Sequence, residues 1–319
     1  MMRWVKRLGV VLVLLLVGGI AFAWTPDGDR AALIARYSDG KSRFLDLGDG
    51  LRVHVRVDGP ETAPVMLLIH GSNASLHTWA GWTEKLAGRY RLVAIDLPGH
   101  GLTGAHPRRD YREESFIDVI DRVVDRLGLP PAIVAGNSMG GELAWKYARA
   151  HPAQVRAMVL IDASGAPGAF PDHASIGHSM MRSAALRPVL RHLTPRILIE
   201  QSLKDSLAVQ QVVTPAMVDR YWELLLFPGN RDATLDRATV RRPAATPAAM
   251  AALGKPVLIL WGAADRLIPP RYGEWYRRAI PGSELIVYPG VGHVPMEEAP
   301  DRTAADVDAW AKRLGAAGA

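Results

Sequence analysis

A serine in a glycine-rich turn is the residue that points most clearly to chemistry. The segment Gly136-Asn137-Ser138-Met139-Gly140 fits the pattern G-x-S-x-G. It follows an apolar run, 132–135, and precedes a segment with helical character, 140–150. Glycines on both sides leave room for a sharp strand-to-helix turn that exposes the hydroxyl. Ser138 is therefore the predicted nucleophile, and a glycine turn without chemistry is the alternative.

A serine hydroxyl needs a base and an acid to orient that base. Of the ten histidines, His293 is the best placed, because it lies in a loop of small residues after the last apolar run, 285–287. Asp265 follows the apolar run 257–260 and is the predicted acid. Asp162 also ends an apolar run and is the rival acid.

Two backbone N–H groups are predicted to bind the negative charge that develops on the attacked oxygen. The run 65–69 ends in His70-Gly71-Ser72-Asn73, where a glycine lets the backbone bend toward the nucleophile. The N–H groups of Ser72 and Met139 are then the expected oxyanion donors. The alternative is an ordinary glycine turn.

These residues require a sheet that brings the ends of several strands together. Six continuous apolar runs have the pattern of strands buried on both faces; they are 65–69, 92–95, 132–135, 158–161, 257–260 and 285–287. Helix-like segments lie between them or after them, at 115–127, 140–150, 271–279 and 301–314. An alternating hairpin over 44–57 precedes them. The sequence thus predicts an α/β fold with a mostly parallel sheet flanked by helices.

The strand–helix alternation stops in the middle of the chain. Residues 165–254 contain no strong strand and suggest three or four helices, which we interpret as a helical cap. Residues 29–164 and 255–319 form the predicted core. Most apolar positions of the cap are expected to pack internally, and the remainder to line a substrate pocket.

The N-terminal segment, 1–28, is predicted to be a membrane anchor or a signal segment. Residues 8–26 carry no charge, and three basic residues precede them: Arg3, Lys6 and Arg7. This pattern predicts a hydrophobic helix that contacts the membrane and holds the catalytic domain outside the cytoplasm, on the periplasmic side in a bacterium. Cleavage after Ala21-Phe22-Ala23, which gives a secreted protein, is the alternative.

The composition excludes several classes of site. The 319 residues include no cysteine, which rules out disulfides, thiolate nucleophiles and cysteine-bound metals. The net charge of +6 comes from scattered basic residues, and pairs such as Arg241-Arg242 are expected in solvated loops. We therefore expect no nucleic-acid partner. The chemistry requires no metal and no organic cofactor, and the sequence leaves the oligomeric state open.

In these motifs the chain resembles the α/β-hydrolase superfamily, in particular its capped, esterase-like members with a serine nucleophile. The resemblance covers Phe44 to Leu314. Five motifs in family order carry it: His70-Gly71, Asp96 to Gly101, Gly136 to Gly141, Trp261 to Asp265, and Gly292 to Pro295. It implies the nucleophile–acid–base order Ser138, Asp265, His293, with Ser72 and Met139 as oxyanion donors.

The resemblance implies a serine hydrolase that cleaves a carboxylic ester, or a related small acyl substrate, through an acyl-enzyme. Relatives that dehalogenate or open epoxides have an aspartate at the nucleophile position, so Ser138 argues against those groups. A carbon–carbon bond hydrolase of the same superfamily is the alternative. A non-catalytic binding protein on this scaffold is a more remote one.

Overall fold

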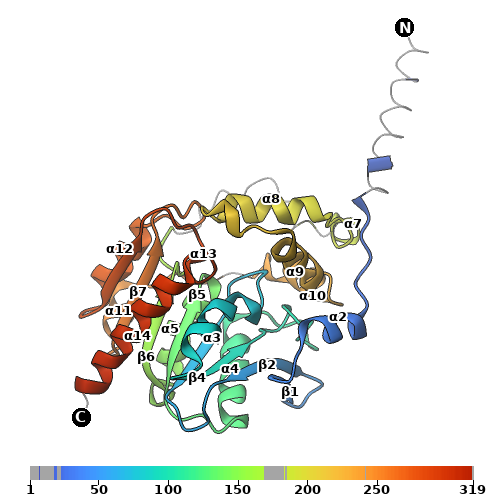
Figure 1. Ribbon diagram of the computed structural model, residues 1–319. Coiled ribbons are helices and arrows are strands. Elements are labelled where there is room, and N and C mark those ends of the chain that lie inside the picture. Colours follow the sequence, from blue (N-terminus) through green and yellow to red (C-terminus); the bar gives the residue numbers. More distant parts are fainter. Residues whose placement is uncertain are drawn as a thin grey trace.

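Eight strands form one sheet, in the order β1-β2-β4-β3-β5-β6-β7-β8 (Figure 1). A computed structural model describes residues 7, 18, 19, 23–168, 183, 185–240 and 242–317. The strands are β1 (Ser42–Asp46), β2 (Arg52–Asp58), β3 (Val65–Ile69), β4 (Arg91–Ile95), β5 (Ala132–Asn137), β6 (Val155–Ile161), β7 (Val257–Gly262) and β8 (Glu284–Tyr288). β2 pairs antiparallel with β1 and β4, and all other pairs are parallel. The predicted fold class is confirmed.

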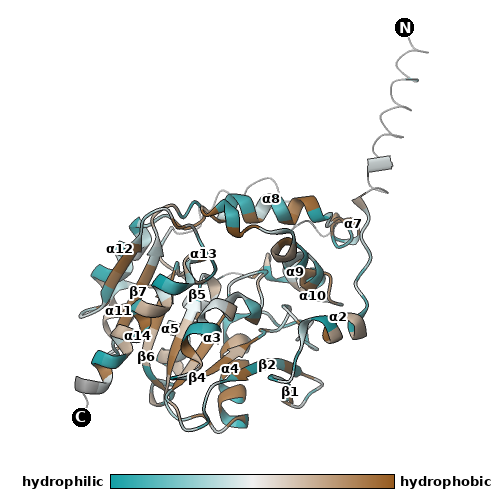
Figure 2. Ribbon diagram, viewed as in Figure 1, coloured by the Kyte–Doolittle hydropathy of each residue, from teal (hydrophilic) through white to brown (hydrophobic). Residues whose placement is uncertain are grey.

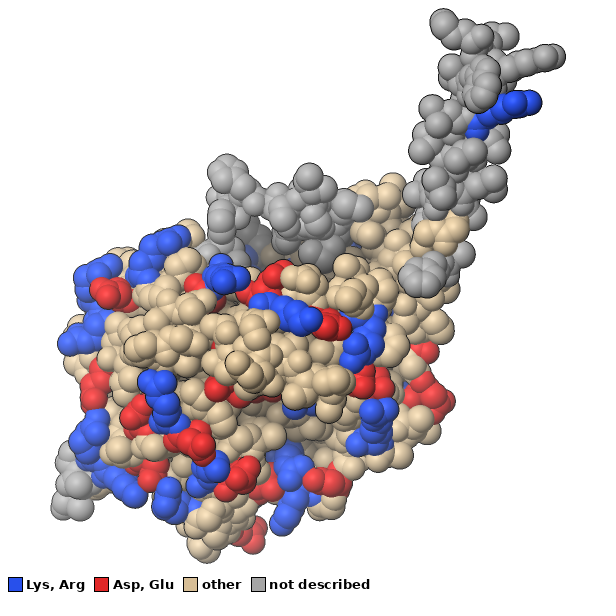
Figure 3. Space-filling view, turned by 45° about the horizontal axis from the view of Figure 1, so that its top comes forward, with Lys and Arg blue, Asp and Glu red and all other residues tan. Residues whose placement is uncertain are grey.

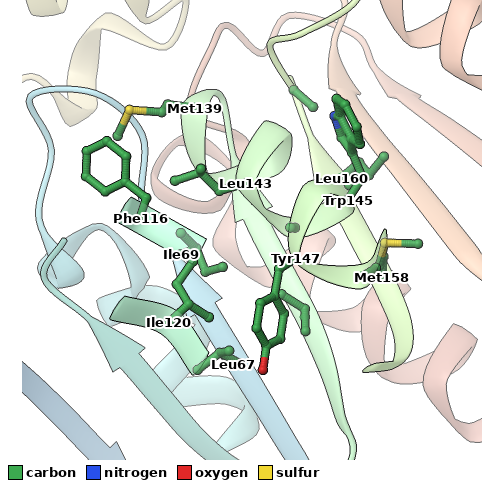
Figure 4. Packing of buried hydrophobic residues seen from close by; sticks show 14 of the residues in the cluster. Leu67, Ile69, Phe116, Ile120, Met139, Leu143, Trp145, Tyr147, Met158 and Leu160 are labelled. Atoms are coloured by element: carbon green, nitrogen blue, oxygen red, sulfur yellow. The ribbon is translucent and has the colours of Figure 1, made fainter. Parts of the chain in front are cut away.

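The strands are continuously apolar because both faces of the sheet are covered. Alternate residues of a strand point to opposite faces. In β3, Leu67 and Ile69 belong to one buried cluster, and Met66 and Leu68 belong to another. Figure 4 shows Leu67 and Ile69 among side chains of the first cluster. In Figure 2 the central strands are correspondingly hydrophobic. The closely packed core on both faces fixes the positions of the strand ends.

Helices cover the two faces of the sheet (Figure 1). The first cluster includes residues of α4 (Glu113–Arg126), α5 (Met139–Ala150), α11 (Pro247–Ala251) and α12 (Arg271–Ala279). The second includes residues of α3 (Ala80–Leu86), α13 (Pro295–Glu298) and α14 (Pro300–Ala317). The predicted helices 115–127, 140–150, 271–279 and 301–314 correspond to α4, α5, α12 and α14, with small shifts at their ends.

The regular elements described between β6 and β7 are all helices, joined by turns and loops. They include α7 (Arg187–Leu190), α8 (Arg196–Ser206), α9 (Pro215–Leu225), α10 (Asn230–Arg237) and α11. In Figure 1, α7 to α10 lie together at one end of the sheet. Residues 169–182, 184 and 241 of the predicted cap lie outside the described residues. The division into a core and a cap stays a prediction.

The prediction of a membrane-anchored protein is corrected by the structure. Among the described residues, no helix has both the length and the apolar character needed to cross a bilayer. Membrane anchoring, with the catalytic domain held outside the cytoplasm, is therefore wrong as a prediction. The apolar residues on which it relied, 8–17 and 20–22, lie outside the described part of the chain.

The end of the predicted leader packs on the helical region. The backbone N–H of Thr25 donates to the carbonyl of His192 at 2.7 Å, and the ring of Trp24 stacks on the His192 ring at 4.3 Å. Asp27 forms an ion pair with Arg231 at 2.6 Å. Residues 24–27 are thus part of the folded structure, although the sequence analysis placed them in the leader.

The charged surface is mixed in sign. On the face shown in Figure 3, Lys and Arg are interspersed with Asp and Glu. Several charged side chains form ion pairs, as Arg36 does with Glu223 at 2.9 Å and Arg109 with Asp236 at 2.8 Å. Exposed pairs of this kind contribute about 0–1 kcal/mol each to the free energy of unfolding.

Candidate active site

Ser138 lies in a strained turn between β5 and α5. Its backbone has φ 54° and ψ −118°, a region that residues other than glycine rarely adopt. Its N–H donates to the Ile161 carbonyl at 2.9 Å, and its carbonyl accepts from the Glu142 N–H at 3.1 Å. These bonds hold the turn at the carboxyl end of β5, directly before the N-terminus of α5.

The glycines that flank Ser138 are required by close backbone contacts. A Cβ on Gly136 would lie 2.1 Å from the carbonyl oxygen of Gly140. A Cβ on Gly140 would lie 2.1 Å from the carbonyl oxygen of Ile69 in β3. The G-x-S-x-G pattern therefore allows the turn to pack against the neighbouring strand.

We predict that Gly140→Ala destabilises the fold by about 3 kcal/mol, because the backbone of β3 must shift to admit the methyl group. Gly88→Ala is the matched control, since a Cβ there meets nothing within 4 Å. The control is expected to change stability by less than about 1 kcal/mol. Urea unfolding monitored by tryptophan fluorescence measures both, and equal stability of the two variants would contradict the prediction.

His293 and Asp265 come together at the ends of β8 and β7. The Nδ1 atom of His293 lies 2.7 Å from Oδ2 of Asp265, and both side chains are buried. The other carboxylate oxygen of Asp265 accepts from the N–H groups of Leu267 at 2.8 Å and Ile268 at 3.0 Å. Asp265 is thus fixed by backbone donors and can in turn fix the imidazole.

A buried carboxylate, to which the sequence analysis assigned no role, holds the His293 loop. Glu298 accepts from the N–H groups on both sides of the histidine, Gly292 at 3.0 Å and Val294 at 3.2 Å. It also accepts from the N–H groups of Ala208 at 2.8 Å and Val209 at 2.9 Å, after α8. Glu298 therefore links the histidine loop to the helical region.

Ser138 and His293 line the same cavity. The cavity has a volume of about 340 Å³, and helical residues such as Leu203 and Leu207 form part of its wall. Among the described residues, no hydrogen bond joins the Ser138 hydroxyl to the His293 imidazole. Catalytic hydrogen bonds are often long without substrate and tighten in the complex. The predicted nucleophile and the predicted base therefore face the same cavity.

The two predicted oxyanion donors are also adjacent to this cavity. Ser72 and Met139 both line it. The hydroxyl of Ser72 donates to the sulfur of Met139 at 3.3 Å, which ties the two segments together. Within the described chain, neither backbone N–H has an acceptor, so both donors are available to a bound oxygen.

Beneath them, His70 supports the loop that carries Ser72. Its Nδ1 atom lies 2.7 Å from the Gly71 carbonyl, and its Nε2 atom accepts from the Leu97 N–H at 3.1 Å. Nδ1 therefore carries the proton. Burial lowers the pKa of His70, so the ring remains a neutral brace rather than a second base.

Residues 64–300 match the family described as "alpha/beta hydrolase fold", which is most of the chain. The protein belongs to this family. The α/β-hydrolase is 26% identical to Lipase 3 of Moraxella sp. (strain TA144), over 96% of this chain and 97% of that protein. Its structure resembles that of a membrane phospholipase A described as a bacterial virulence factor, with a TM-score of 0.73, 26% identity, and coverage of 98% and 99% of the two chains.

Another relative of this α/β-hydrolase has a different named activity. Epoxide hydrolase 3 of Xenopus tropicalis is 30% identical over 199 residues, which are 61% of this chain and 53% of that protein. The present chain thus spans about half the length of that relative. In the present chain, the turn after β5 carries a serine, Ser138.

Asp162, the rival acid, is the second carboxyl group beside the histidine. One ligand atom from each of Asp162, Asp265 and His293 lies within 4.8 Å of the others. Two carboxylates and an imidazole can together bind a metal ion. Here, however, Oδ2 of Asp265 and Nδ1 of His293 already form a hydrogen bond with each other. The Oδ1 atom of Asp162 accepts from the Gly262 N–H at 2.9 Å, and its buried Oδ2 has no hydrogen-bond partner among the described residues. Asp265 differs from Asp162 in its hydrogen bond with Nδ1 of His293.

Asp162 is expected to make the stability of this α/β-hydrolase depend on pH. Burial and the neighbouring Asp265 charge raise the pKa of Asp162 well above its usual value of 3.8. The unfolded chain loses this proton near pH 3.8, whereas the folded chain retains it to higher pH. The contribution of Asp162 to the free energy of unfolding therefore falls as the pH rises above 3.8 toward the folded pKa.

Asp162→Asn retains an acceptor for Gly262 and cannot ionise. We predict that its free energy of unfolding, relative to wild type, increases between pH 4.5 and pH 8, with a slope of at most about 1.4 kcal/mol per pH unit. Urea unfolding of both proteins across this range measures the difference. A difference that is independent of pH would contradict a raised pKa.

A second Ser–His–Asp arrangement lies outside the cavity and was not predicted. The Nδ1 atom of His54 lies 2.7 Å from Asp96, and its Nε2 atom lies 2.9 Å from the hydroxyl of Ser42. Burial opposes ionisation of Asp96, but the His54 hydrogen bond and charge lower the pKa of this carboxyl group. Asp96 also accepts from the N–H groups of Leu76 and Leu102. This arrangement joins β1, β2 and the loop after β4, and we assign it a structural role.

Proposed function

We propose that this α/β-hydrolase is a serine hydrolase that cleaves a carboxylic ester through an acyl-enzyme. The observation that carries the proposal is the buried 2.7 Å contact between His293 and Asp265, beside a cavity that Ser138 also lines. A carboxylate on Nδ1 leaves Nε2 of the imidazole as the proton acceptor. The strained turn at Ser138 supports the same assignment.

The reaction proceeds in two steps. The Oγ atom of Ser138 attacks the ester carbonyl carbon while Nε2 of His293 takes the hydroxyl proton. The N–H groups of Ser72 and Met139 bind the oxyanion, and His293 then donates its proton to the departing alcohol. Water attacks the acyl-serine by the same route in reverse, releases the acid and restores the serine. Asp265 orients the imidazole and stabilises its protonated form.

An ester is favoured by the cavity and by the relatives. Apolar side chains from the helical region line the cavity and suit an acyl chain, namely Ile199, Leu203, Leu207 and Leu225. The proteins named as a lipase and a phospholipase A match nearly the whole chain. We therefore propose that residues 165–254 act as a cap that covers the acyl group, and that the substrate is a small molecule.

Labelling with a fluorophosphonate probe and a panel of 4-nitrophenyl esters test this proposal. Native protein is expected to bind one probe per chain and to hydrolyse short esters. Protein that is heat-denatured before the probe is added is expected to remain unlabelled. Lack of labelling together with lack of ester turnover would contradict it and favour a binding protein. Turnover of a vinylogous dienol, without ester turnover, would instead favour carbon–carbon bond cleavage.

A further inference from the structure

The cavity beside Ser138 has a positive charge that the ester reaction does not use. Arg242 lines it, and no Asp or Glu is found among its described lining residues. Across the described part of the chain, Arg242 forms no ion pair. The sequence analysis expected the pair 241–242 in a solvated loop, whereas Arg242 is half-buried at the cavity.

A second arginine lies close to Arg242 and also lacks a carboxylate partner among the described residues. The guanidinium of Arg237 is buried and donates only to neutral oxygens: Asn73 at 2.8 Å, Thr234 at 2.9 Å and the Gly99 carbonyl at 3.1 Å. Burial and the charge of Arg242 lower the pKa of Arg237 to about 9, which keeps it charged at neutral pH.

Two other buried cations of the described chain do have a carboxylate partner. Lys146 lies 2.7 Å from Glu142, and Arg231 lies 2.6 Å from Asp27. A buried cation without an anion is costly, because it loses hydration that no opposite charge replaces. Two neighbouring arginines without a carboxylate therefore leave a positive region that a bound anion would neutralise.

Asn73 connects this positive region to the reaction centre. It follows the oxyanion residue Ser72, has φ 58° and lines the cavity. Its Oδ1 atom accepts from Arg237 at 2.8 Å and from Thr234 at 3.1 Å. That engagement identifies the other end of the amide as the N–H₂ group, which has no acceptor within the described residues.

We infer that Arg242 and Asn73 form an anion subsite in the cavity, which binds a carboxylate or phosphate carried by the ester substrate. The inference rests on the proposed ester hydrolysis and specifies its substrate class. A guanidinium presents parallel N–H donors that match the oxygens of either group, and an amide N–H₂ adds a further donor. Arg237 does not touch the ligand in this account; it positions Asn73.

Two matched pairs of substrates test the subsite and distinguish its ligands. For a carboxylate, 4-nitrophenyl hydrogen adipate is compared with methyl 4-nitrophenyl adipate, in which the free carboxyl group is methylated. Release of nitrophenolate is the readout for both. For a phosphate, 1-hexanoylglycerol 3-phosphate is compared with 1-hexanoylglycerol, with released hexanoate as the readout. The wild-type protein is expected to have about a tenfold higher kcat/KM for the anionic member of at least one pair.

Arg242→Gln is expected to remove this preference through a higher KM for the anionic substrate, while kcat/KM for the neutral partner changes less than about twofold. Arg242→Lys retains the charge and is expected to restore part of the preference. Arg126→Gln, an exposed arginine at the end of α4, is the matched control and retains it in full. The inference is overturned if wild type prefers neither anion, or if R242Q lowers both members of a pair equally.

Binding without turnover separates this inference from the proposed function. Adipate and hexyl phosphate are titrated into wild-type and Arg242→Gln protein by calorimetry. Binding of either anion that is lost in R242Q supports the subsite even if every ester proves inert, in which case only the ester reaction fails. Ester turnover in a protein that binds neither anion overturns the subsite and leaves the proposed function intact.

Discussion

Replacing Ser138 by alanine is expected to lower kcat for ester hydrolysis by about 10³-fold or more. The change removes the attacking oxygen, and the residual rate then depends on the oxyanion donors and on substrate binding alone. The methyl group of alanine fits the space of the serine side chain. We therefore expect a far-UV circular dichroism spectrum and a Tm close to those of wild type.

Ser42→Ala is the matched control for this prediction. Ser42 bonds to a His–Asp pair as a nucleophile would, but it is not among the residues that line the cavity. Its alanine variant is expected to retain ester hydrolysis within about twofold, because Ser42 contacts no reacting atom. Near-wild-type activity of S138A, or a loss confined to S42A, would show that the nucleophile is misassigned.

The second large effect is expected at the acid. Asp265→Asn is expected to reduce kcat by about 10³- to 10⁴-fold, since an amide at this position favours the wrong imidazole tautomer and cannot stabilise the imidazolium. The Asn oxygen can still accept from Leu267 and Ile268, so the loop is expected to keep its position. The expected loss is therefore in catalysis rather than in folding.

Asp162→Asn provides the comparison, because Asp162 lies within 4.8 Å of the same histidine and aspartate. In the described part of the chain its Oδ2 atom has no hydrogen-bond partner, and the Asp265 carboxylate contacts Nδ1 of the imidazole instead. We expect D162N to lower kcat less than about tenfold. Steady-state kinetics on one 4-nitrophenyl ester ranks the two variants, and a greater loss in D162N would transfer the role of acid to Asp162.

The sheet was predictable because burial on both faces leaves continuous apolar runs. All six runs became parallel strands, and their order along the chain limited the ways in which the sheet could form. The helix α3 was not predicted, since it has seven residues and includes Gly81, so its period is weak. The hairpin of β1 and β2 was predictable from alternation.

Candidate site residues could be proposed from sequence where a polar residue comes soon after a strand: Ser138 follows β5 directly, and Asp265 and His293 lie in the loops after β7 and β8. Contacts between distant segments could not be predicted in the same way. Glu298 binds four backbone N–H groups, yet only its position near the histidine marks it in the sequence. Arg242 resembled a solvated loop residue until the fold placed it at the cavity.

The absence of charge in the N-terminal segment did not predict where its last residues pack. The uncharged stretch 8–26 predicted a membrane anchor, but hydropathy alone does not report where residues 24–27 pack. Those residues contact the helical region through His192 and Arg231, which are distant in sequence. Such contacts depend on the tertiary fold and leave no periodic signal.

Trapping of the acyl-enzyme is the most direct test of the central claim. Protein mixed with a 4-nitrophenyl ester is quenched in acid within milliseconds, and its peptides are analysed by mass spectrometry. We predict one acyl group per chain, attached to the hydroxyl of Ser138, and no such adduct in S138A. Ester turnover without an adduct on Ser138, or with the acyl group on another residue, would contradict the account.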